Sequence, residues 1–150
     1  MSLLNRFNED LKGAMKASEG AKVSVLRMIK SEVKNRQIDK GRELTDEEIM
    51  EVLSRMAKKS RESIEQFANA GRTDLVKKEE QELSVLQSYM PRQMSHEEID
   101  RLIHEAIAEA SARNAQDMGR VMRVLMPKVK GVADGKYVNQ RAKELLEKGG

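Results

Sequence analysis

The sequence predicts an all-α protein, and two observations, its helical periodicity and its composition, favour that class. Apolar residues recur every three or four positions along most of the 150 residues, which is the period of an amphipathic helix. Charged residues make up 35% of the chain and there are only two prolines, as is typical of long, ion-paired helices. The chain has no cysteine, so disulfides and thiolate metal sites are excluded.

Residues 1–90 predict an N-terminal domain of antiparallel helical hairpins packed as a bundle. A first amphipathic helix is expected over about residues 2–16, closed by Gly20. A second is expected over about residues 21–40, ending at Gly41, where the absence of a Cβ permits a left-handed backbone.

The second hairpin of this domain is predicted from its caps. Thr45 to Glu48 forms a capping box, which opens a long helix that Ala70 and Gly71 stop. Thr73 is expected to cap a fourth helix. The short connection between these helices predicts that they fold back on one another.

Pro91 interrupts the helical pattern, because proline has no backbone donor and disfavours helical angles in the residue before it. Residues 91–94 are therefore predicted to be a hinge, and residues 95–150 a small C-terminal three-helix domain. Its first helix follows a capping box that begins at Ser95. The other two are expected over about residues 117–126 and 134–147, with Asp134 as the cap of the last.

The C-terminal domain concentrates positive charge, since residues 118–143 contain seven basic residues and one acid. This pattern predicts contacts with the phosphate backbone of structured RNA. A solvated helix surface is the competing interpretation. The predicted RNA-binding residues are Arg120, Arg123, Lys128, Lys130 and Lys136, and those predicted to set the turn geometry are Gly131, Asp134 and Gly135.

No catalytic residue, metal site or cofactor site is predicted. The two histidines, His96 and His104, match no zinc or catalytic spacing and are expected at the surface. The acids Glu79, Glu80 and Glu82 could pair for acid/base work, although a solvated helix face is the favoured interpretation. A second basic stretch, residues 22–42, is interpreted as a lysine-rich surface.

No membrane association is predicted, because no apolar run approaches the length of a membrane span. The first helix carries Glu9 and Asp10, unlike a signal or transit peptide. A cytoplasmic location is therefore expected.

Four motifs spread over the chain resemble those of the YqeY family of small bacterial proteins. They are LRMIKSEVKNRQIDKGRELTDEEI (Leu26–Ile49), SRESIEQFANAGRTDLVKKEEQEL (Ser60–Leu83), YMPRQMS (Tyr89–Ser95) and MGRVMRVLMPKVKGVADGKYVNQ (Met118–Gln140). Departures are mild, such as Met90 and Met94 where leucine is usual.

The last third also resembles the tail domain of GatB, a subunit of the tRNA-dependent amidotransferase. The matching residues are Met118, Gly119, Val121, Met122, Gly131, Ala133, Asp134, Gly135, Val138 and Asn139. The resemblance implies a GatB/YqeY-type accessory protein that binds tRNA or other structured RNA, with amidotransferase or aminoacyl-tRNA synthetase components as partners. The alternative that it implies is a component of glutamine-dependent amidotransferase (carbon-nitrogen ligase) activity that requires partner subunits.

Overall fold

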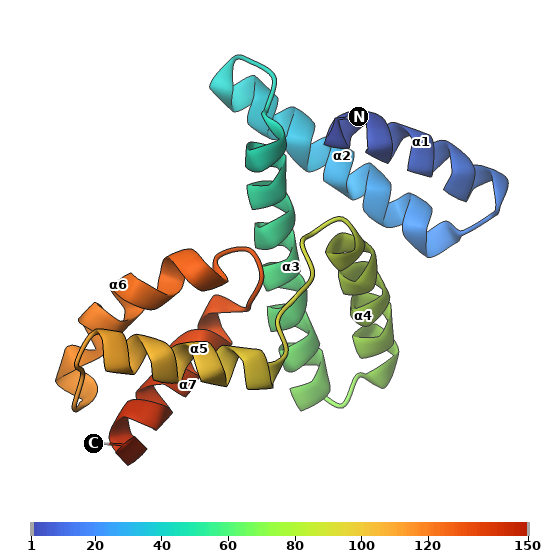
Figure 1. Ribbon diagram of the computed structural model, residues 1–150. Coiled ribbons are helices and arrows are strands. Elements are labelled where there is room, and N and C mark those ends of the chain that lie inside the picture. The colour runs from blue at the N-terminus through green and yellow to red at the C-terminus, as the bar shows by residue number, and fades with distance from the viewer. Residues whose placement is uncertain (1, 150) are drawn as a thin grey trace. The chain divides into compact units, whose positions relative to one another are not determined.

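The computed structural model describes residues 2–149, and it confirms the all-α prediction (Figure 1). It contains seven α-helices and one short 3-10 helix, with no strand in the described range. The elements are α1 (Leu3–Lys16), α2 (Gly20–Lys40), α3 (Asp46–Asn69), α4 (Thr73–Ser88), α5 (His96–Glu109), η1 (Ala115–Asp117), α6 (Met118–Val129) and α7 (Gly135–Gly149). They divide into unit 1, which ends at Met90, and unit 2, which begins at Pro91.

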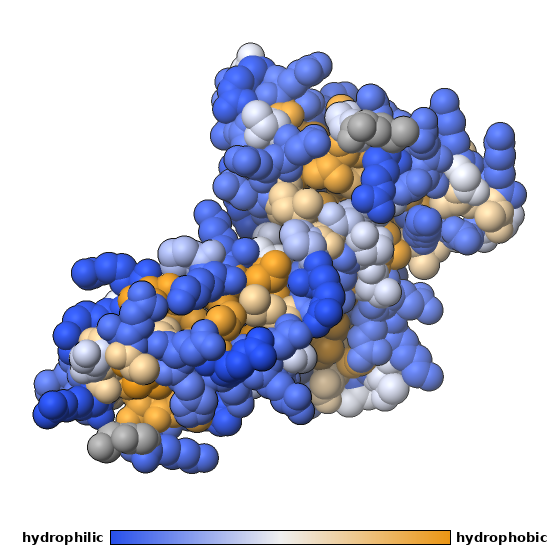
Figure 2. All heavy atoms as spheres, viewed as in Figure 1, coloured by the Kyte–Doolittle hydropathy of each residue, from blue (hydrophilic) through white to orange (hydrophobic). Residues whose placement is uncertain are grey.

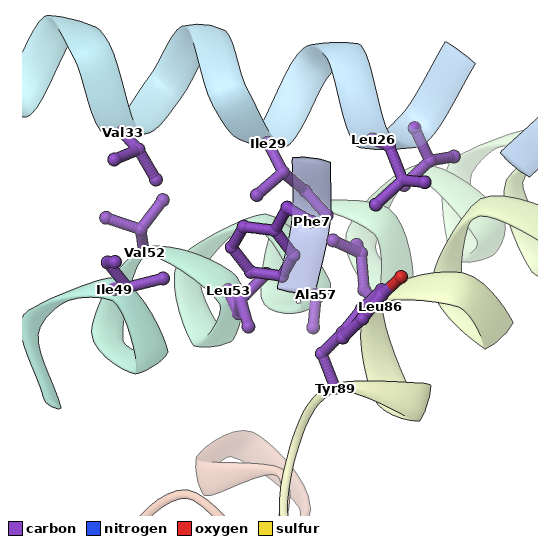
Figure 3. Close-up of a cluster of buried hydrophobic side chains, with 11 residues drawn as sticks. Phe7, Leu26, Ile29, Val33, Ile49, Val52, Leu53, Ala57, Leu86 and Tyr89 are labelled. Carbon is purple, nitrogen blue, oxygen red and sulfur yellow. The ribbon is translucent and has the colours of Figure 1, made fainter. Parts of the chain in front are cut away.

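Unit 1 is built on one apolar core to which all four of its helices contribute (Figure 3). Phe7 of α1 is fully buried and meets Tyr89 edge-on, with ring centroids 5.0 Å apart. The Tyr89 hydroxyl points away from the cluster and donates a hydrogen bond to the Asp10 carboxylate at 2.6 Å. Burial, followed by this bond, raises the pKa of Tyr89 well above its usual range. The first helix is thus held by both packing and a polar contact.

The predicted helix ends with clear local signals are confirmed. The Thr45 hydroxyl accepts from the Glu48 amide at 3.2 Å, and the Glu48 carboxylate accepts from the Thr45 amide at 3.0 Å. Ser95 and Glu98 form the same box at the start of α5. Gly41 follows α2 with φ 69°, in the left-handed region that favours glycine.

Two predicted helix boundaries in unit 1 are wrong. Gly20 does not close the first helix, because α1 ends at Lys16 and Gly20 is the first residue of α2. The left-handed position is taken by Ser18, at φ 56°, and the amide of Glu19 then donates to the Ala14 carbonyl at 2.9 Å. Thr73 does not cap α4 but begins it, and the cap residue Arg72 makes no side-chain capping bond.

The sixth helix runs past its predicted end at Met126, through Pro127 to Val129. Proline removes one hydrogen bond from a helix but keeps helical φ. Here the backbone bonding resumes at once, because the amide of Lys130 donates to the Met126 carbonyl at 3.0 Å. The extra turn also buries Val129, which is 1% exposed, and that burial offsets the missing bond.

Unit 2 has its own core, in which α5, α6 and α7 pack together. Ile103, Leu125 and Val138 are fully buried at its centre. Figure 2 shows that hydrophilic residues cover most of the face in view, with apolar residues showing between them. No helix within residues 2–149 is long and apolar enough to cross a membrane.

Candidate nucleic-acid interface

The five predicted RNA-binding residues are all exposed, and the core of unit 2 holds the helices that carry them. We call these residues the basic surface: Arg120, Arg123, Lys128, Lys130 and Lys136. These side chains lie at the surface, whereas the buried face of α6 packs through Val121, Leu125 and Val129.

Arg120 and Arg123 share one face of α6, since residues three apart on a helix are neighbours. The Arg120 guanidinium donates to the Asp117 carboxylate at 2.7 Å. Asp117 also accepts from the backbone amide of Arg113 at 2.8 Å, and these bonds, the backbone one first, lower the pKa of its carboxyl. Arg123 has no ion pair within the described residues, so its full charge faces solvent.

Lys128 and Lys130 differ in their surroundings, which the sequence did not indicate. Lys128 lies on the flank of α6 towards α5, and its ammonium pairs with Glu109 at 3.4 Å. Lys130 follows α6 and makes no ion pair with another described residue. An incoming phosphate must therefore displace Glu109 to reach Lys128, whereas Lys130 is already available.

Two residues of the predicted hinge, Gln93 and Met94, hold the turn between α6 and α7 in place. The amide of Met94 donates to the Val132 carbonyl at 2.8 Å, and the Gln93 side chain donates to the Gly131 carbonyl at 3.2 Å. Residues 93 and 94 thus belong to unit 2. In the sequence, the polar side chain of Gln93, two positions after Pro91, is the one feature that could have indicated this contact. Its partner, Gly131, lies 38 positions away along the chain.

The three predicted turn residues have different roles. Gly131 has φ 80°, in the left-handed region that favours glycine. Asp134 caps α7, since its carboxylate accepts from the Lys136 amide at 3.2 Å. Gly135 does not match the prediction: it is the first residue of α7, without a positive φ, and a side chain there would meet open space.

Tyr137 is the one Phe, Tyr or Trp residue within residues 91–150, and its ring is already stacked. The ring of Tyr137 lies parallel to that of His96, with centroids 4.0 Å apart. His96 and His104 are both exposed, which confirms their predicted surface location. Because one face of Tyr137 is covered, any nucleic acid here would meet charge and shape rather than an open stacking platform.

A bidentate ion pair between Asp100 and Arg141 joins α5 to α7. The Asp100 carboxylate accepts from Arg141 Nε at 2.9 Å and from Arg141 Nη2 at 3.1 Å. These bonds lower the pKa of Asp100. A carboxyl with a depressed pKa in the folded state stabilises it above the unfolded pKa, and this contribution is lost as the pH falls through the folded value.

Replacing Asp100 with Asn is therefore expected to lower the Tm of unit 2 by a few degrees at neutral pH, because Arg141 loses its bidentate partner and keeps only Glu144. The difference from the parent should shrink as the pH falls from neutral through the lowered pKa of Asp100, because the parent carboxylate then becomes protonated. Thermal unfolding followed by circular dichroism across this range measures it. The matched control is Asp74→Asn, which removes an exposed pair with nearby Arg72 and should change little. Equal Tm values for parent and Asp100→Asn at neutral pH would contradict the role of the pair.

Two of the three acids noted in the sequence lie in a different setting from the solvated face expected for them. Glu79 is half-buried, and its carboxylate accepts from the Ser60 hydroxyl at 3.1 Å. Glu82 is also half-buried, whereas Glu80 is exposed. Across residues 2–149, no group of three or more histidine or acidic side chains is placed to hold a metal ion.

Fold and surface together define a class: a helical protein of two units, the second of which presents exposed arginines and lysines around a braced turn. The sequence model described as Yqey-like protein matches residues 4–146. The chain therefore belongs to the YqeY family.

The related sequences are fungal. The chain is 33% identical over 147 residues to "Altered inheritance of mitochondria protein 41, mitochondrial" of Pyrenophora tritici-repentis, covering 96% of this chain and 81% of that protein. It is 30% identical to the protein of the same name from Lachancea thermotolerans, covering 72% of this chain and 59% of that protein. Since both names carry a mitochondrial label, the cytoplasmic location stays a prediction.

Proposed function

We propose that unit 2 binds structured RNA, with tRNA as the first candidate, through the basic surface. The observation that carries the proposal is the exposure of five cationic side chains on a packed three-helix unit. Helix packing and the bonds from Gln93 and Met94 hold the turn in place, so phosphate contacts there would order little further backbone. The resemblance of the last third to the GatB tail domain supports tRNA in particular.

The expected mode of binding is recognition of backbone charge and helix shape. Arginine and lysine neutralise phosphates without reading base sequence. The stacking of Tyr137 on His96 supports the same mode, because the Tyr137 ring is not open on both faces to stack with unpaired bases. Discrimination should therefore follow the fold of the RNA more than its sequence.

Titration of labelled total tRNA with the full chain tests the proposal. Affinity should fall linearly with salt on logarithmic axes, with a slope of roughly −0.9 for each phosphate neutralised. An unstructured homopolymer such as poly(U) is the control and should bind more weakly. Crosslinking in the native cell should enrich tRNA. Salt-independent binding, or no RNA above background, would overturn the proposal.

The second candidate is a component of glutamine-dependent amidotransferase activity, which the resemblance to the GatB tail favours. In that case the chain would contribute tRNA binding, and partner subunits would release ammonia and activate the carboxylate. Assays of the purified chain for glutaminase activity and ATP turnover separate this candidate from a binding role alone. Activity that persists through repeated purification would replace the binding-only proposal with an enzymatic one.

A further inference from the structure

Unit 1 contains a half-open groove of about 840 Å³ between α2, α3 and α4. Its apolar lining includes Met28 of α2, Met56 of α3 and Leu86 of α4. Met28 is 47% exposed, an unusual position for a large apolar side chain. Methionine is flexible and polarizable, and it recurs on surfaces that accept a range of apolar partners. The groove thus exposes an adaptable apolar lining to solvent.

One side of α2 packs in the core of unit 1, and another side lines the groove. Val25, Leu26 and Ile29 are buried in the core of unit 1. Ser24 and Met28, one turn apart on the other side of the helix, line the groove. The core therefore buries one side of α2, whereas Ser24 and Met28 on the other side are exposed.

One set of groove residues is cationic. Arg55 and Lys59 lie one turn apart on α3, and Arg27 lines the groove from α2. All three are exposed, and none makes an ion pair with another described residue. Their charges are available to acidic groups of a ligand.

Acidic residues also line the groove: Glu32 of α2, and Glu79 and Glu82 of α4. Glu79 and Glu82 lie three residues apart on α4. Burial, followed by repulsion from Glu79, raises the pKa of Glu82. A lysine or arginine of a ligand would relieve this repulsion. The three carboxylates of the lining would repel RNA phosphates, so the mixed charges favour a protein ligand.

We propose that this groove docks an amphipathic helix of a partner protein. Apolar side chains of that helix, spaced one turn apart, pack on the exposed Met28 and the half-buried Met56. Its acidic flank faces Arg55 and Lys59, and a basic residue of its other flank lies against Glu79 and Glu82. A groove that opens to solvent along three helices suits the side chains of a helix face better than a compact metabolite, because small-molecule pockets enclose most of their ligand. This docking does not depend on RNA binding by unit 2.

Designed helical peptides test the charge pattern with the full chain. The probe carries a leucine stripe, glutamates along one flank and lysines along the other. Two companion peptides keep the stripe but carry only glutamates or only lysines. Fluorescence anisotropy should show micromolar binding of the mixed-flank probe, and affinity about tenfold weaker for each companion. Equal binding of all three peptides, or no binding of the probe by about 1 mM, would overturn the proposal.

Two substitutions on the same helix locate the site. Met28→Glu should weaken binding of the mixed-flank probe at least about tenfold, since it places a charge in the apolar lining. Ile38→Glu is the matched control, because Ile38 is 67% exposed on α2 and lies outside the groove. It should leave the affinity within about twofold. Both side chains are exposed, so circular dichroism should show intact helices. Unchanged affinity of Met28→Glu would refute the assignment, whatever the result of the RNA titration.

Discussion

Replacing Lys128 and Lys130 together with alanine is expected to weaken tRNA binding by up to about a hundredfold at about 0.1 M salt. Each phosphate contact releases counterions from the RNA when the complex forms. For each contact that is lost, the affinity should therefore fall by roughly tenfold and the salt slope by roughly one unit. Lys130 should account for the larger part, because Lys128 must first leave Glu109. Fluorescence titration at several salt concentrations measures both quantities.

The matched control is Lys30→Ala with Lys34→Ala, which removes the same charge from α2 in unit 1. It should change the affinity much less. Helicity and Tm should stay nearly constant in both double variants, since Lys34, Lys128 and Lys130 are exposed and Lys30 is partly so. If the α2 variant abolished binding while the variant at the turn bound normally, the RNA surface would lie in unit 1. The roles assigned to the two units would then be reversed.

A second large effect is expected from single core truncations, because each unit has its own core. Ile103→Ala should destabilise unit 2 by roughly 2–5 kcal/mol, the usual cost of an aliphatic cavity. Leu53→Ala should destabilise unit 1 by a similar amount. Both side chains are fully buried. Such losses are a large fraction of the stability of a small domain.

The pattern of melting distinguishes two cores from one. Ile103→Ala should lower only the transition of unit 2, and Leu53→Ala only that of unit 1, as followed by scanning calorimetry. Ile38→Ala is the control and should shift neither transition, because Ile38 is 67% exposed. A single transition that moves with every core variant would show that the units unfold together and would contradict independent cores.

The sequence by itself determined the all-α class, most helix ends and the location of the main basic stretch. These features depend on local chemistry: the side chain of Thr45 or Ser95 reaches an amide three residues away, and Gly41 and Gly131 adopt the left-handed backbone near a helix end without the steric cost of a Cβ. Local sequence patterns gave the wrong end for two helices. Ser18 took the left-handed position expected near Gly20, and burial of Val129 carried α6 past Pro127.

Only the tertiary structure decided which charges remain available and where an apolar surface stays open. The pair between Lys128 and Glu109 and the bond from Gln93 to Gly131 join residues far apart in sequence. The groove needs faces of α2, α3 and α4 at once. Helical periodicity assigns each residue to a face of its own helix, but the packing of helices against one another decides which faces meet. That is why Glu79 and Glu82, expected on a solvated face, line a half-buried groove.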